Sequence, residues 1–246
     1  MSRKSIRKGA FFMGIIMERY VIHACPDRMW YVDEYLVPSM LKQHIPRDEI
    51  LIWCDVERKG CLQTAIDCFE YCGKHEGGCW HLQDDVIIAK DFAKRTQAAD
   101  SEIECGFCHS LYENRDGRSV DRTGKVESRY MWSSFPCIYI PNRMAKDFVE
   151  WYYTKAMYRP QYEVFIFEKK HDDSFWRDFV NECLQDEMVL NHVPSLIDHV
   201  DWLIGGSVVN RLRGTNVRSY YWTNEDMIED LRNRLRKEGH GSSVLF

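Results

Sequence analysis

The sequence lacks an apolar run of about 18 residues, the length that a membrane-spanning helix needs. Proline (7) and glycine (14) are sparse among its 246 residues, and no stretch is rich enough in either to form a flexible linker. It also has no internal repeat and no low-complexity segment. These absences argue against a membrane span, a fibrous protein and a disordered chain. They predict a globular protein with a sizeable core.

The chain also lacks a strong charge of one sign and a clear export signal. A formal net charge of -5 argues against a protein that coats nucleic acid by charge alone. A basic segment precedes the apolar stretch 10–17, but Glu18 and Arg19 end that stretch and no small-residue cleavage site follows. Ten cysteines are present, yet disulfide-rich secreted proteins are short and exported. We therefore expect reduced thiols in a cytoplasmic protein.

Apolar runs suited to strands alternate with helical patterns in the first part of the chain. Strands are expected at 20–24, 49–54 and 79–82, with helices after the first two. The first of these helices should place Met29, Val32, Leu36 and Met40 on one apolar face. This order predicts an α/β fold with a mostly parallel central sheet flanked by helices. Ligands of such sheets bind outside the carboxyl ends of the strands. Further along, we expect strands at 104–111 and 131–140, helices at 142–156 and 173–184, and a surface loop at 112–129.

The chain divides into three expected parts. Residues 1–17 form an N-terminal extension, residues 18–210 a single domain of Rossmann type, and residues 211–246 a helical segment. From Arg211 to Lys237 there are seven Lys or Arg residues against four Asp or Glu. The basic character of this segment suits either a solvated helix face or an acceptor-binding surface.

Adjacent carboxylates end the third apolar strand at Asp84 and Asp85, directly after Gln83. Two neighbouring like charges are costly in a buried place unless a cation offsets them. Mg²⁺ and Mn²⁺ prefer carboxylate oxygens and often bridge to substrate phosphates. A divalent metal site is therefore one interpretation, and a solvated turn in which one aspartate caps a following helix is the other.

A second candidate ligand lies far along the chain. Residues 191–200 read as a loop leading to His199, whose neutral imidazole would complete an oxygen-rich metal site. The alternative is a histidine that only satisfies local hydrogen bonds. Close cysteines at Cys105 and Cys108 raise the question of zinc, but a structural zinc site needs two such pairs.

Taken in order, these motifs resemble the GT-A class of nucleotide-sugar glycosyltransferases. The resemblance covers roughly residues 20–210. It rests on these features: Arg28 after the first strand, Asp55 after the second, Gln83-Asp84-Asp85-Val86 followed by Asp91-Phe92, and Pro194-Ser195-Leu196-Ile197-Asp198-His199.

The resemblance implies roles for particular residues. Asp85 and His199 would be ligands of Mn²⁺ or Mg²⁺, and Asp84 would assist with the metal and the donor diphosphate. The donor would be UDP- or GDP-linked, with Arg28 facing its phosphate and Asp55 contacting its ribose or base. Gln83 departs from the pattern, since many members have an acid at its position, and an amide binds a divalent ion more weakly than a carboxylate does.

A second acid pair, Asp172 and Asp173, precedes an expected helix. One interpretation is helix capping, because carboxylates are favoured at helix N-termini. The other is the general base of an inverting transferase, with Asp173 as the first choice and Asp172 as the second. The acceptor remains open between a glycan, a protein, a small molecule and a modified nucleic acid. The rival functions are a metal-dependent phosphohydrolase or nuclease using both acid pairs and an inactive nucleotide-sugar-binding protein.

Overall fold

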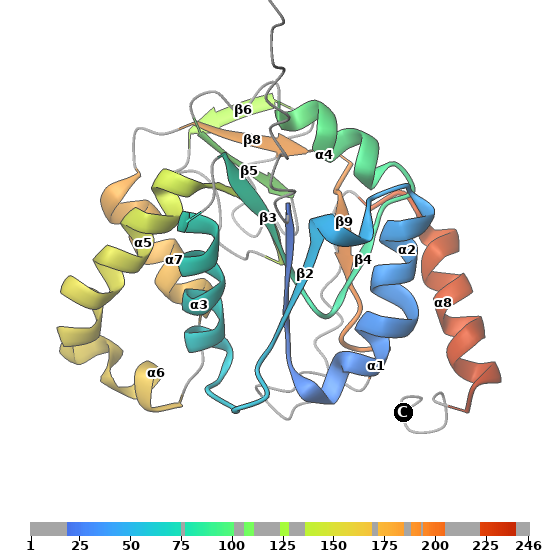
Figure 1. The fold of residues 1–246 in the computed structure, drawn as a ribbon, viewed down its shortest axis with the longest axis horizontal. Coiled ribbons are helices and arrows are strands. Elements are labelled where there is room, and N and C mark those ends of the chain that lie inside the picture. Colours follow the sequence, from blue (N-terminus) through green and yellow to red (C-terminus); the bar gives the residue numbers. More distant parts are fainter. Residues whose placement is uncertain are drawn as a thin grey trace, which may run out of the picture.

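The computed structural model describes residues 19–74, 77–100, 106–110, 124–127, 136–168, 172–184, 188–192, 194–204 and 222–239. The expected N-terminal extension 1–17 lies outside the described residues. Strands and helices alternate over residues 20–83, and further along the chain several strands follow one another, as Figure 1 shows. Among the helices that are described, none is long and apolar enough to cross a membrane.

A seven-stranded sheet forms the centre, in the order β2-β1-β3-β7-β5-β8-β6. Its strands are β1 (Tyr20–Ala24), β2 (Ile50–Cys54), β3 (Gly78–Gln83), β5 (Gly106–Ser110), β6 (Gly124–Glu127), β7 (Cys137–Pro141) and β8 (Met188–His192). β2, β1 and β3 are mutually parallel, β7 is antiparallel to β3 and β5, β8 is parallel to β5, and β6 is antiparallel to β8. Five strands therefore run in one direction, which confirms an α/β fold with a mostly parallel sheet.

Helices cover both faces of the sheet (Figure 1). The longer ones are α2 (Val37–Lys42), α3 (Cys61–Lys74), α4 (Phe92–Asp100), α5 (Asn142–Thr154), α6 (Glu163–Glu168), α7 (Asp172–Cys183) and α8 (Glu225–Lys237). Apolar residues of α3, α5 and α7 pack in one buried cluster, to which β1 contributes Val21. The other cluster contains Ile22 from the opposite face of β1, together with residues of α2 and α8. The alternation along β1 thus connects the two layers.

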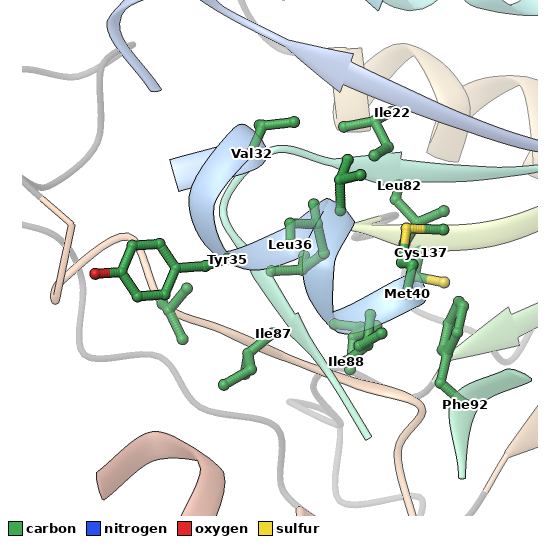
Figure 2. Packing of buried hydrophobic residues seen from close by; sticks show 14 of the residues in the cluster. Ile22, Val32, Tyr35, Leu36, Met40, Leu82, Ile87, Ile88, Phe92 and Cys137 are labelled. Carbon is green, nitrogen blue, oxygen red and sulfur yellow. The ribbon is translucent and has the colours of Figure 1, made fainter. Parts of the chain in front are cut away.

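The helical region after β1 comprises short consecutive segments. These are η1 (Pro26–Arg28), α1 (Met29–Tyr31), the π-helical η2 (Val32–Leu36) and then α2. Val32, Leu36 and Met40 are buried on one side of this region, as their spacing predicts. Figure 2 shows them beside Ile22 and Leu82 of the sheet. This packing fixes the start of the region, and hence Arg28, at the end of β1.

Two expectations about loops were wrong. The predicted surface loop 112–129 contains β6, which pairs with β8. The predicted loop 191–200 contains the end of β8 and the short strand β9 (Ile197–His199), which pairs antiparallel with β4 (Val86–Ile88). Each of these short strands depends on a partner far away in sequence, so local composition did not identify it.

Gly78 allows the close approach of β3 and β7. Its φ is +148°, and a Cβ built at this position would lie 2.3 Å from the carbonyl oxygen of Ile140 and 2.8 Å from the Cα of Pro141. We expect Gly78→Ala to lower the free energy of unfolding by about 2 kcal/mol or more, because backbone must move to relieve the clash. Urea denaturation measures this change. The matched control is Gly239→Ala, which has a positive φ but no neighbouring atom within 4 Å. Equal losses for the two variants would contradict the role of close packing.

Candidate active site at the ends of strands β1 and β3

The acid pair lies between two strands. β3 ends at Gln83 and β4 begins at Val86, so Asp84 and Asp85 form the connection. Both aspartates are buried, with 5% and 7% of their surface exposed. The capping interpretation of this pair is wrong, because a strand and not a helix follows it. Buried adjacent carboxylates require positive charge nearby.

Strand pairing brings His199 to this position. In the β4–β9 ladder, Val86 lies opposite His199, and the backbone N–H of Val200 donates to the carbonyl of Asp85 at 2.8 Å. The His199 Nε2 atom is 3.0 Å from Asp85 Oδ2. The structure therefore joins two of the residues that the sequence proposed as metal ligands, despite their separation along the chain.

Arg28 lies against both aspartates. Its side chain is buried, and its Nη1 atom is 2.9 Å from Asp84 Oδ1 and also contacts Asp85 Oδ2. The second oxygen of Asp84 accepts the backbone N–H of Cys25 at 2.7 Å. In this structure Arg28 is thus directed at the acid pair, whereas the sequence-based hypothesis directs it at a donor phosphate.

Neighbouring charges shift the pKa values of Asp85 and His199 in opposite directions. Burial alone would raise the pKa of Asp85, but Arg28 and His199 hold that pKa well below its usual range. Burial also acts to lower the pKa of His199, and the nearby Asp85 and Asp201 outweigh it and raise this pKa to about 10. At neutral pH Asp85 is then a carboxylate held between a guanidinium and an imidazolium.

Three neighbours of the acid pair were not identified from the sequence. Asp201 Oδ1 lies 3.1 Å from His199 Nδ1 and orients the ring. The Tyr31 hydroxyl donates to the carbonyl of Val86 at 2.9 Å. His23 is buried at the end of β1, and burial lowers its pKa despite the nearby aspartates. Only Asp201 had a sequence signal, an acid two residues after a proposed histidine ligand.

The donor atoms suit a divalent cation in their chemistry. Two carboxylates and an imidazole are ligand types that Mn²⁺ accepts. Asp85 Oδ1 is a buried oxygen with no hydrogen-bond partner among the described residues. The side chains nevertheless converge on Arg28 in this structure, and within the described residues no three His, Cys, Asp or Glu side chains form a group that could hold a metal ion. An ion would therefore have to replace part of the positive charge that Arg28 and protonated His199 supply.

Asp172 approaches the same strand end from the other face of the sheet. It is the first residue of α7, it is buried, and its Oδ2 lies 3.5 Å from the amide Nε2 of Gln83. Burial, and secondarily the charge of Asp173, raise the pKa of Asp172 to about 7. The neutral Gln83 suits this contact, since an acid at its position would repel Asp172. A carboxyl with a pKa near neutrality is a group that can accept or release a proton under working conditions.

Asp173 and Asp55 make local contacts instead. Asp173 Oδ1 accepts the backbone N–H of Ser174 at 2.7 Å in the first turn of α7, which suits the helix-terminus interpretation for this residue. The two oxygens of Asp55 accept the backbone N–H groups of Lys59 and Gly60, both at 2.7 Å. Asp55 therefore shapes the turn before α3 at the end of β2. Contact with a donor ribose or base remains a prediction.

Comparison with known proteins identifies no family for this chain. No protein-family model matches the chain, and a search of curated proteins found no match.

Proposed function

We propose that this chain is a GT-A-like glycosyltransferase, which transfers a sugar from a UDP- or GDP-linked donor to an acceptor hydroxyl. The observation that carries the proposal is the meeting of Asp84, Asp85, His199 and Arg28 at the carboxyl end of β1 and β3. Parallel strands in α/β sheets commonly place ligands at this edge. A compact group of positive and negative side chains at this edge suits a diphosphate together with its metal counterion.

Donor binding would exchange partners within this group. A diphosphate offers Arg28 a bidentate anion in place of the aspartates. Mn²⁺ or Mg²⁺ would then compensate the charge of Asp85, and His199 would have to release its proton to bind the ion as a neutral imidazole. When bound, such an ion would stabilise the negative charge on the departing diphosphate. Arg28 would supply the same kind of stabilisation from the protein side. Metal and nucleotide are therefore expected to favour each other's binding.

Asp172 is our choice for the general base, ahead of Asp173. It is the buried carboxyl in contact with Gln83, next to the acid pair, whereas Asp173 bonds to its own helix turn. Asp172 would take the proton of the acceptor hydroxyl while that oxygen bonds to the anomeric carbon. The bond from the anomeric carbon to the diphosphate would break at the same time, and its electron pair would leave with the diphosphate. Such a direct displacement inverts the anomeric configuration.

The test is nucleotide affinity across a Mn²⁺ titration, measured calorimetrically with UDP and GDP. We expect the wild-type protein to bind one of them roughly tenfold or more tightly with Mn²⁺, since the ion removes repulsion between phosphate and carboxylate. Asp85→Asn keeps the shape of the side chain but removes its charge, and should abolish this coupling. His199→Ala should weaken it.

Asp48→Ala is the control, because Asp48 is an exposed acid in η3 (Arg47–Glu49). This segment precedes the first residue of β2 and so lies at the edge of the sheet opposite the acid pair. This variant should retain the full effect of Mn²⁺. Nucleotide affinity that ignores the metal in the wild-type protein would remove the metal from the proposal. If the protein binds neither UDP nor GDP, the glycosyltransferase proposal is contradicted. Cleavage of phosphodiesters without a sugar donor would instead favour the phosphohydrolase or nuclease.

A further inference from the structure

A groove of about 500 Å³ lies between α2 and α8. Its apolar lining includes Tyr35, Ile87 and Leu231, each of which is less than a tenth exposed. Figure 2 shows Tyr35 and Ile87 on the side of the buried cluster away from Ile22 and Leu82. The volume falls in the range of roughly 300–1,000 Å³ that is typical of small-molecule pockets. We call this feature the α2–α8 groove.

The charges of the α2–α8 groove have the opposite sign to the net charge of the chain. Lys42, Lys90, Arg234 and Lys237 line it, and Asp230 is the one acid among the described lining residues. The whole sequence carries a formal charge of -5. A concentration of cations around an apolar floor therefore sets this groove apart from the average surface.

Two of these cations have protein partners and two are available. Lys90 pairs with Asp226, and the guanidinium of Arg234 lies 4.3 Å from the ring centroid of Tyr35. Lys42 and Lys237 are exposed and form no ion pair within the part of the chain that the structure describes. They lie at opposite ends of the groove, because Lys42 ends α2 near the beginning of α8, whereas Lys237 ends α8. The acid next to Lys237, Glu238, contacts the Tyr35 hydroxyl, so the Lys42 end is the one that suits an anionic group.

We propose that the α2–α8 groove binds a small amphipathic anion, with its phosphate or carboxylate at Lys42 and its apolar body on Tyr35, Ile87 and Leu231. The apolar floor provides area for burial, and Lys42 provides charge-assisted hydrogen bonds. This site is separate from the acid pair and does not depend on the glycosyltransferase function. It does lie close to it, because Ile87 belongs to the strand that follows Asp85.

Alkyl phosphates test both parts of the proposal on the full-length chain. Isothermal titration would compare hexyl phosphate, octyl phosphate, inorganic phosphate and uncharged 1-octanol. We expect octyl phosphate to bind more tightly than hexyl phosphate by roughly fourfold or more, since each buried methylene adds to affinity. Inorganic phosphate and 1-octanol should each bind at least about tenfold more weakly than octyl phosphate, because the first lacks the alkyl chain and the second lacks the anionic group.

Charge reversal then locates the site. Lys42→Glu should weaken octyl phosphate binding roughly tenfold and Lys237→Glu should weaken it much less, and both positions are exposed, so the fold should persist. Arg143→Glu on α5 is the matched control, because α5 covers the opposite face of the sheet (Figure 1), and it should leave binding unchanged. Inorganic phosphate binding as tightly as octyl phosphate would overturn the amphipathic class of ligand. Equal losses in all three variants would overturn the location.

Discussion

Asp172→Asn is expected to lower turnover on the true acceptor by about 10²- to 10⁴-fold while donor affinity changes little, since the variant removes a general base and leaves donor contacts in place. The asparagine keeps the size of the side chain and can still contact Gln83. Steady-state rates and calorimetric donor affinity measure the two effects. The wild-type rate should rise with pH through about 7, because burial raises the pKa of Asp172 to about 7 and only its carboxylate accepts a proton.

The same variant has a second readout that does not depend on activity. In the unfolded chain an aspartate loses its proton near pH 3.8, whereas folded Asp172 keeps it up to about pH 7. The folded state therefore binds more protons between these values, and the stability of the wild-type protein falls as pH rises through this window. Asp172→Asn abolishes that contribution. Its melting temperature should exceed that of the wild-type protein at pH 8 and approach it near pH 4.

Asp173→Asn is the matched control for both measurements. Its carboxylate bonds to the N–H of Ser174 and is less buried than Asp172, so we expect a change of about 1 kcal/mol in stability and near-normal turnover. A large loss of turnover in Asp173→Asn with little loss in Asp172→Asn would restore the order that the sequence suggested. Full turnover in both variants would show that neither acid is the base.

The order of these two acids shows what the sequence could not reveal. The sequence predicted a helix at 173–184 with the acid pair at its beginning, and α7 starts one residue earlier, at Asp172. Which of the two is buried depends on how α7 packs against the end of β3, and no local pattern contains that information. The contact with Gln83 also gives a physical reason for the amide that departs from the GT-A pattern, because an acid there would repel Asp172.

For the acid pair, the sequence predicted the charged site but not how its parts are brought together. An apolar strand that ends in two aspartates was enough to predict a charged site at the edge of the sheet. The approach of His199 follows from the pairing of β4 and β9, two strands of three residues each, whose mutual recognition is too weak to read from composition. The position of Arg28 follows from the helical region after β1, whose apolar face the sequence did predict.

Arg28→Gln is expected to destabilise the protein by about 3 to 5 kcal/mol, because removing one partner of a buried ion pair leaves uncompensated charge. Asp84 and Asp85 would then share His199 as their remaining cation in this group. For a chain of this length each kcal/mol corresponds to a fall in melting temperature of about 2–4 °C. Arg58→Gln is the control, since the Arg58 and Asp27 side chains are 71% and 49% exposed and such pairs contribute little.

Mn²⁺ should recover a large part of that loss in Arg28→Gln and stabilise the wild-type protein much less. The variant presents two carboxylates without their guanidinium, so an ion meets free acceptor oxygens, while in the wild-type protein it competes with Arg28. A ligand at about 100 times its dissociation constant adds about 2.7 kcal/mol to stability. Melting curves across a Mn²⁺ series, without nucleotide, measure the difference. A small initial loss would contradict the ion-pair network, and a large loss that Mn²⁺ leaves unchanged would show that Arg28 is the site's resident cation and that no ion replaces it.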